Sequence, residues 1–401
     1  MIASPSGMSS GLGAEFLISA GEASGDLHAA RLLQELLALD PTLRAFGMGG
    51  PELRSAGMDV VADSSEISVV GITEALKILP RARQFFDLLV HEVVRRGATV
   101  AMLVDFPDFN LRLAKALKRR GVRVVYYISP QVWAWRRRRV HTIAKVVDLM
   151  LVVLPFEVDF YRDHGVPVIH VGHPLVDEVP ELPQIWDRPD ADREPLRLAL
   201  LPGSRRSELE ANLPVMLETA ELLAKERKLD CAIVKASSIS TQHVERLLGA
   251  SSLRPRIASN RRFEVLSESH LALCASGTAT LEVGLLTTPM IVIYRVHAWT
   301  YMLGRMLVRL PFISLVNLVL RKEAVPEFIQ GQAVATKIYG EARSILEDRD
   351  RIGQMRRDLA LLRPALGESG ASVKASAHVM EILAQSRSEA ERADEDLNES
   401  R

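Results

Sequence analysis

The chain has 401 residues, of which 48% are hydrophobic and 25% are charged. This composition excludes an intrinsically disordered chain, and the length predicts two folded domains, each with its own core. Fifty basic residues balance fifty acidic residues, so no net charge attracts nucleic acid or an acidic membrane, and any such attraction must be local. The cysteines, Cys231 and Cys274, lie in apolar runs without zinc or redox spacing, which favours a reducing compartment.

The N-terminal stretch carries no targeting signal that we recognise. It lacks a basic region, and Gly21 and Glu22 interrupt the first apolar run, so we expect no signal peptide. No apolar segment has the length of a membrane span, which predicts a soluble or peripheral protein. Gly11 and Gly13 precede the first predicted strand, whereas a dinucleotide-binding fingerprint would follow it.

The first half of the chain alternates short apolar runs with amphipathic segments, a pattern typical of β–α–β units in a parallel sheet. A helix is predicted over residues 27–39, directly after the segment GEASGD. Each predicted strand ends in a loop rich in polar residues, glycine or proline, and ligands gather at that edge of an open parallel sheet. The predicted strands cover residues 16–20, 43–46, 100–104, 122–128 and 149–153.

A second sheet is predicted after a proline-rich stretch. Five prolines and several acidic residues between positions 174 and 195 indicate an interdomain linker. Helices are expected over residues 214–224 and 278–286. The predicted strands cover residues 198–201, 231–234, 271–274 and 290–294.

These patterns predict an α/β protein with two doubly wound domains that face each other across a cleft. The expected division is an N-terminal domain at 1–175, a linker at 176–195, a C-terminal domain at 196–345, C-terminal helices at 346–385 and a disordered polar tail at 386–401.

Residues 196–210 (LRLALLPGSRRSELE) predict a strand, a tight turn at Gly203 and Ser204, and the start of a helix. The first amides of a helix after such a turn can bind an anion. Arg205 adds a planar guanidinium, which suits a diphosphate because it can hold two oxygens at once. The alternative is an ordinary loop with solvated arginines, and the turn alone does not separate the two readings.

A similar turn follows the predicted strand at 271–274, in the segment CASGTATLE. Ser276, Gly277 and Thr278 offer amides and hydroxyls to an anion, and Glu282 could accept hydrogen bonds from a ribose. The alternative for Glu282 is a surface position on a helix. Two such turns in one domain favour a nucleoside diphosphate. Because no Asp-x-Asp cluster follows a strand there, we expect no metal and no cofactor.

Acidic residues in the first half are candidates for the chemistry of a hydroxyl nucleophile. Asp105 follows the strand at 100–104 and is our candidate general base. Asp108 lies where an N-cap of the next helix is expected. Glu22, Ser24 and Asp26 are either helix caps or contacts to an acceptor substrate.

Two further segments combine apolar and basic side chains. Residues 133–139 (WAWRRRR) could stack bases, lie at lipid headgroups, bind a sugar phosphate or form a solvated face. Balanced charge and the lack of an RNA-binding motif argue against nucleic acid. Residues 69–89, around Pro80, predict a helix pair that contacts acyl chains or a bilayer surface, although core packing explains them nearly as well.

Nine segments occur in the order and spacing of one enzyme family. They resemble the lipid-A-disaccharide synthases, which are inverting GT-B glycosyltransferases with two Rossmann-like domains. The segments extend from about Gly21 to Asn317, so they cover most of the chain. They are GEASGD, GMGGPELRSAGM, DFPDFN, YYISPQVWAWRRRRV, LPFE, GHPLVD, LPGSRRSE, ASGTATLE and SLVNL.

The resemblance implies transfer of 2,3-diacylglucosamine from UDP-2,3-diacylglucosamine to 2,3-diacylglucosamine 1-phosphate, which yields a β-1,6-linked disaccharide and UDP in lipid A biosynthesis. It also implies a cytoplasmic protein in peripheral contact with the inner membrane, and a homodimer. Two alternatives stay open. One is a UDP-N-acetylglucosamine 2-epimerase of the same architecture, and the other is a lipid-binding module without catalysis.

The resemblance and the two turns together define the expected site. Asp105 is the expected catalytic acid-base residue. The expected UDP-sugar contacts are Gly203, Ser204, Arg205, Glu208, Ser276, Gly277, Thr278, Glu282 and Asn317. The expected acceptor contacts are Glu22, Ser24, Asp26, Asp108 and Trp133.

Overall fold

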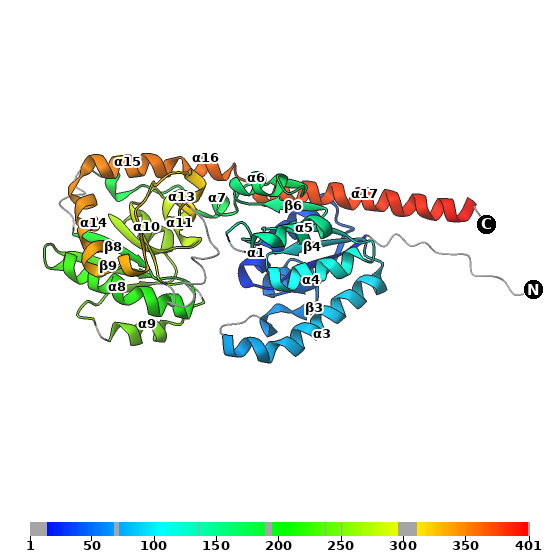
Figure 1. The fold of residues 1–401 in the computed structure, drawn as a ribbon, viewed down its shortest axis with the longest axis horizontal. Coiled ribbons are helices and arrows are strands. Elements are labelled where there is room, and N and C mark those ends of the chain that lie inside the picture. The colour runs from blue at the N-terminus through cyan, green and yellow to red at the C-terminus, as the bar shows by residue number, and fades with distance from the viewer. Residues whose placement is uncertain are drawn as a thin grey trace, which may run out of the picture.

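The computed structural model describes residues 14–67, 72–134, 136–188, 195–236, 238–249, 251–295 and 311–399. They form two α/β domains (Figure 1). The first domain has a seven-stranded sheet in the order β3-β2-β1-β4-β5-β6-β7, and the second has a six-stranded sheet in the order β10-β9-β8-β11-β12-β13. The strand pairs described are all parallel. The strand order reverses beside β1 and beside β8, which are the ligand-binding positions of such sheets.

The sheet of the first domain is covered on both faces, so its central strands are apolar on both sides. In β4, Val100, Met102 and Val104 pack into one core, whereas Ala101 and Leu103 pack into the other. The strands are β1 (Glu15–Ala20), β2 (Arg44–Gly49), β3 (Asp59–Asp63), β4 (Val100–Val104), β5 (Arg123–Tyr127), β6 (Leu149–Val152) and β7 (Val168–His170). The helices are α1 (Ala23–Leu39), α2 (Pro51–Ser55), α3 (Ile72–Arg96), α4 (Pro107–Lys118), α5 (Val140–Val146) and α6 (Phe156–Arg162).

The second domain repeats this construction around β8 and β11. Its strands are β8 (Leu196–Leu201), β9 (Leu229–Val234), β10 (Arg256–Ala258), β11 (Leu271–Ala275), β12 (Met290–Tyr294) and β13 (Glu327–Ile329). Its helices are α8 (Arg206–Ala224), α9 (Thr241–Leu248), α10 (Arg262–Ser267), α11 (Ala279–Leu285), α13 (Leu315–Leu320), α14 (Ala335–Glu347) and α15 (Arg349–Ala360). Short 3₁₀ helices are η1 (Ser64–Glu66), η2 (Arg137–Arg139), η3 (Ile185–Asp187) and η4 (Gln330–Gln332).

The chain crosses between the domains twice, and the two crossings are hydrogen-bonded to each other. The first crossing contains α7 (Leu175–Glu178), and the second contains α16 (Leu362–Leu366) and leads into α17 (Ala371–Glu399). The amide of His173 donates to the carbonyl of Leu366 at 3.0 Å. The Asp177 carboxylate accepts from the amide of Gly370 at 2.8 Å. These bonds fix the two connections side by side.

The C-terminal helix α17 returns to the first domain and extends beyond it (Figure 1). It packs against α1. Arg387 forms an ion pair with Asp40 at 3.2 Å, and Gln385 accepts a hydrogen bond from Arg123 at 3.0 Å. The disordered tail expected from residue 386 is therefore wrong for residues 386–399, which continue this helix, while residues 400 and 401 lie outside the described part.

The helix pair expected over residues 69–89 is a single helix, α3, with Pro80 inside it. Residues 69–71 and the side chains of 72–77 lie outside the described part of the chain. Phe85 and Leu89 are buried in the core of the first domain, so core packing explains this half of the segment. Among the described residues, the structure contains no helix with the length and apolar character of a membrane span.

Candidate active site

Asp105 lies in a tight turn directly after β4. Asp105 and Phe106 both have left-handed backbone conformations, with φ of 44° and 48°. Such conformations cost roughly 1–3 kcal/mol each in residues other than glycine, so the surrounding structure must hold them. The Asp105 amide donates to the carbonyl of Tyr127 at 3.1 Å, and the Asp105 carbonyl accepts from the Tyr126 hydroxyl at 2.6 Å.

Asn110 completes the support of this turn from inside α4. Its side chain is fully buried, and its amide nitrogen donates to the carbonyl of Asp105 at 2.8 Å. The Asn110 side-chain oxygen accepts from the Ser19 hydroxyl at 2.7 Å, which ties the turn to β1. The sequence analysis did not identify Asn110, although a polar residue among the apolar positions of this helix was the available signal.

The loop after β1 packs directly against the Asp105 turn. A Cβ atom on Gly21 would lie 2.2 Å from the Phe106 ring, so only glycine fits this position. This close approach places Glu22 beside Asp105, since β1 and β4 are neighbours in the sheet.

The pKa of Asp105 is raised to about 6, mainly because its carboxyl group is buried and further because Glu22 is negatively charged. The Phe106 amide and the guanidinium of Arg205 oppose this shift. Arg205 follows β8 in the second domain, so its charge reaches Asp105 from the other domain. The charges of Glu22 and Arg205 therefore both act on the Asp105 carboxyl group.

The turn after β8 binds the carboxylate of Glu208 from its own chain. This carboxylate accepts hydrogen bonds from the amide of Ser204 at 2.9 Å and from the guanidinium of Arg205 at 3.0 Å. Gly203 permits the approach, because its φ is 117° and a Cβ atom would lie 2.6 Å from Glu208. The Glu208 carboxylate therefore occupies the groups at which a diphosphate is expected, and the expected contact between Glu208 and UDP stays a prediction.

The turn after β11 presents a more open surface. Among the described residues beyond its two chain neighbours, no heavy atom lies within 4 Å of the position where a Cβ on Gly277 would stand, and Thr278 is the N-cap of α11. The Ser276 hydroxyl donates to the carbonyl of Ile313 at 3.0 Å. One turn into the helix, Glu282 lies 3.5 Å from the guanidinium of Arg262, and burial raises the pKa of Glu282 while Arg262 opposes the shift.

Comparison with known families and proteins identifies the family of this chain. The family described as lipid-A-disaccharide synthetase matches residues 16–382. The chain belongs to this family. The lipid-A-disaccharide synthase of Myxococcus xanthus is 43% identical to this chain over 371 residues, and that of Geobacter sulfurreducens is 43% identical over 372 residues. Each alignment covers 92% of this chain and 97% of the relative. The resemblance found in the sequence is confirmed, and the protein is a glycosyltransferase.

Solved structures confirm the GT-B fold. The UDP co-structure of S. aureus MnaA has a TM-score of 0.63 at 12% identity and covers 92% of this chain and 97% of that chain. Acinetobacter baumannii MurG has a TM-score of 0.54 at 12% identity and covers 93% of this chain and 99% of that chain. At these identities the similarity concerns the fold alone.

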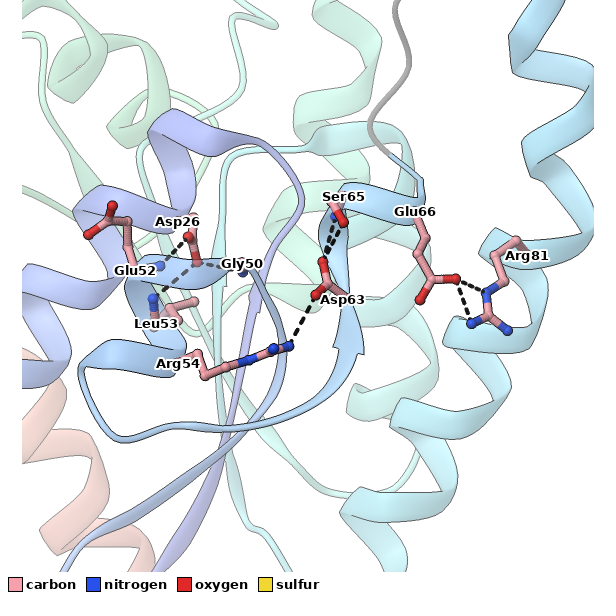
Figure 2. Close-up of polar contacts among 9 residues, drawn as sticks. All are labelled: Asp26, Gly50, Glu52, Leu53, Arg54, Asp63, Ser65, Glu66 and Arg81. Carbon is pink, nitrogen blue, oxygen red and sulfur yellow. Dashed lines mark hydrogen bonds and ion pairs between the residues drawn. The ribbon is translucent and has the colours of Figure 1, made fainter.

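Two residues that were expected to contact substrates, Asp26 and Asn317, are used inside the protein instead. Asp26 is buried and accepts hydrogen bonds from the amides of Gly50 at 2.7 Å and Glu52 at 2.9 Å, which caps α2 (Figure 2). Asn317 is also buried. Its side-chain nitrogen donates to Val325 and Glu327, each at 2.8 Å.

The side-chain oxygen of Asn317 accepts from the amides of Ala324 at 2.8 Å and Val325 at 3.0 Å. Its four hydrogen-bonding positions are therefore filled, and none remains for a nucleotide. Asp26 and Asn317 hold loops in place and do not fit direct substrate contact. Glu22 and Ser24 are exposed at the start of α1, and the Glu22 side chain does not cap that helix.

The loop after β5 carries the last two expected acceptor contacts. Trp133 is buried, and its indole nitrogen donates to the carboxylate of Glu157 at 2.9 Å, so the ring does not present a stacking surface. Asp108 is not the N-cap of α4, because Phe106 takes that position. Asp108 is exposed and accepts hydrogen bonds from Arg136 at 3.3 Å and Arg139 at 2.5 Å.

Glu157 anchors this loop and was not identified from the sequence. Its fully buried carboxylate also accepts hydrogen bonds from the Ser129 hydroxyl and from the amide of Leu154 at 3.1 Å. Burial raises the pKa of Glu157 to about 7, against the effect of these hydrogen bonds. The segment LPFE gave its position but not its partners, since Ser129 and Trp133 lie more than twenty residues away.

Proposed function

We propose that the protein transfers 2,3-diacylglucosamine from UDP-2,3-diacylglucosamine to the 6-hydroxyl of 2,3-diacylglucosamine 1-phosphate. The products are the β-1,6-linked disaccharide 1-phosphate of lipid A biosynthesis and UDP. Membership of the lipid-A-disaccharide synthetase family supports these substrates. The observation that carries the mechanism is the buried carboxyl group of Asp105, which the positive charge of Arg205 reaches from the other domain.

In the proposed reaction, the acceptor hydroxyl attacks the anomeric carbon from the face opposite UDP. A single displacement of this kind needs the nucleophile and the leaving group on opposite walls of a cleft. Asp105 takes the hydroxyl proton as the new carbon–oxygen bond forms. A pKa of about 6 suits this role, because the carboxylate is ionised at neutral pH and is more basic than an ordinary aspartate.

The bond between the anomeric carbon and UDP breaks with its electron pair on the diphosphate. Arg205 stabilises this charge with a guanidinium that can hold two oxygens. The exposed side chain of Arg205 pairs with Glu208 at 3.0 Å, and we expect the diphosphate to replace that carboxylate. The proposal includes no metal. Among the described residues, no group of three His, Cys, Asp or Glu side chains is arranged to hold one.

The test mixes purified protein with the UDP-sugar and the lipid acceptor and measures both UDP and disaccharide. We expect both products, and we expect the rate to be unchanged by a chelator. A UDP-N-acetylglucosamine 2-epimerase would instead convert its UDP-sugar without any acceptor. A lipid-binding module would bind the acceptor without release of UDP.

We also propose that the reaction takes place at the inner face of the cytoplasmic membrane, because both substrates carry acyl chains. Leu79 of α3 supports this location, since this large apolar side chain is 56% exposed. Replacement of Leu79 by serine should weaken co-sedimentation with lipid vesicles while the thermal unfolding midpoint stays unchanged. Unchanged vesicle binding would exclude this part of α3 from the membrane contact.

A further inference from the structure

Four consecutive arginines, residues 136–139, follow β5 at the same edge of the sheet as Asp105, and the mechanism above does not use them. Arg136 has a left-handed backbone with φ of 58°, and η2 begins directly after it. Strained positions of this kind persist only where the surroundings fix them, and they concentrate at ligand sites. Here the loop is fixed at its start by Glu157, which holds Ser129 and Trp133.

Asp108 fixes the other end of the loop and brings two of these arginines together. Its Oδ1 atom accepts from Arg136 at 3.3 Å and from Arg139 at 2.5 Å. Two guanidinium groups therefore face the same carboxylate. The side chains of Arg136 and Arg139 are 44% and 30% exposed, so solvent reaches both of them.

This arginine pair lies close to the catalytic turn. Asp108 is three residues from Asp105 and lies in the first turn of α4. The Tyr126 hydroxyl, which donates to the Asp105 carbonyl, is within electrostatic reach of Arg139 as well as of Asp105 and Asp108. An anion bound by Arg136 and Arg139 would therefore lie near the base without contacting it.

We propose that Arg136 and Arg139 bind the phosphate monoester of the acceptor lipid. The inference rests on the proposed function and assigns a binding site to the phosphate group of the acceptor substrate. Guanidinium forks suit a phosphate monoester because each can hold two of its oxygens. The acceptor carries its phosphate on C1 and its reactive hydroxyl on C6 of the same sugar. Binding of the phosphate at the arginine pair thus directs the hydroxyl toward Asp105.

The experiment compares the acceptor with its dephosphorylated form, 2,3-diacylglucosamine, at a saturating concentration of UDP-sugar. The variants are Arg139→Gln and Arg136→Gln, with Arg138→Gln as the matched control, because Arg138 is exposed on the same helical turn. We expect Arg139→Gln to lower kcat/KM for the phosphorylated acceptor roughly 10- to 100-fold, the effect of one charge-assisted hydrogen bond. The dephosphorylated acceptor should lose less than twofold, measured as substrate or, where its turnover is too slow, as competitive inhibitor.

Three results would overturn the proposal. They are an equal loss for both acceptors, an increased KM for the UDP-sugar, and a loss confined to binding of vesicles with anionic lipid. The last result would assign the arginines to membrane headgroups. The unfolding midpoint of each variant shows whether it is folded. Failure of the proposed function itself is distinct, because the wild-type protein would then release no UDP from the two substrates.

Discussion

The turns after β4 and after β8 both follow a central strand of a parallel sheet, yet they are held in different ways. The β4 turn is strained and partly buried, and three groups from β5 and α4 bind its backbone at Asp105. The β8 turn is exposed, and the carboxylate of Glu208 binds its amides. A base works best when it is desolvated and fixed before the substrate arrives, whereas a surface carboxylate can be exchanged for a diphosphate.

Among the substitutions that test these two turns, replacement of Asp105 by asparagine should have the largest effect on turnover. Positioned base catalysis supplies on the order of 10²- to 10⁴-fold in rate, so turnover should fall at least 100-fold. Binding of the UDP-sugar should be largely kept, because asparagine has nearly the same shape. The measurement is kcat together with UDP-sugar affinity. A near-normal rate would remove Asp105 from the role of base.

Removal of the Arg205 side chain tests the other turn. Arg205→Ala should weaken UDP binding roughly 10- to 100-fold, since a charge-assisted hydrogen bond is lost. It should also move the acidic limb of the pH–rate profile to higher pH, because Arg205 lowers the pKa of Asp105. Arg206→Ala is the control, as Arg206 pairs with Glu210 at 2.9 Å. Equal UDP affinity in Arg205→Ala and wild type would contradict the assignment.

The sequence predicted the sheets well because strands buried on both faces become continuous apolar runs. Residues 100–104 and 290–294 are strands β4 and β12 with the predicted bounds. The strands β3, β7, β10 and β13 were missed, because they have three to five residues and at most one residue in each is fully buried. α8 begins at Arg206 and not near residue 214, since Pro214 lies inside the helix, where the sequence suggested a first turn.

The position of Asp105 could be read from the sequence because it follows a strand at the ligand-binding edge. The side chains that hold the Asp105 turn in place could not be predicted from the sequence. Ser19 and Asn110 are 91 residues apart and meet only in the folded sheet. Asn317 shows the converse: a match to a family segment located the residue, but only the structure shows that its side chain is fully occupied by Val325, Ala324 and Glu327.

Loss of the buried amide of Asn110 would test whether the β4 turn depends on its support. Asn110→Ala leaves the Ser19 hydroxyl without its acceptor and removes one of the two donors to the Asp105 carbonyl, which should cost about 1–3 kcal/mol of unfolding free energy. Turnover should fall as well, because the base is no longer held. Denaturant unfolding and kcat are the two measurements. Lower stability with unchanged kcat would mean that the turn keeps its conformation without Asn110.

The smallest expected effect concerns Glu22, whose negative charge raises the pKa of Asp105. Glu22→Gln removes that charge, so the pKa of Asp105 should fall. A base acts in its ionised form, which is present above its pKa, and the acidic limb of the pH–rate profile should therefore move to lower pH. Burial is the larger cause of the raised pKa, so the shift should stay below about one pH unit.

Glu35→Gln, further along α1, is the matched control and should leave the limb in place. Profiles of kcat/KM between pH 5 and 8 report the free enzyme, where the neighbouring charge acts before any substrate binds. A shift of the acidic limb to higher pH, or an equal shift in both variants, would show that this limb does not arise from the titration of Asp105 under the influence of Glu22. A shift to lower pH in Glu22→Gln alone would identify the buried carboxyl group of the β4 turn as the group that titrates.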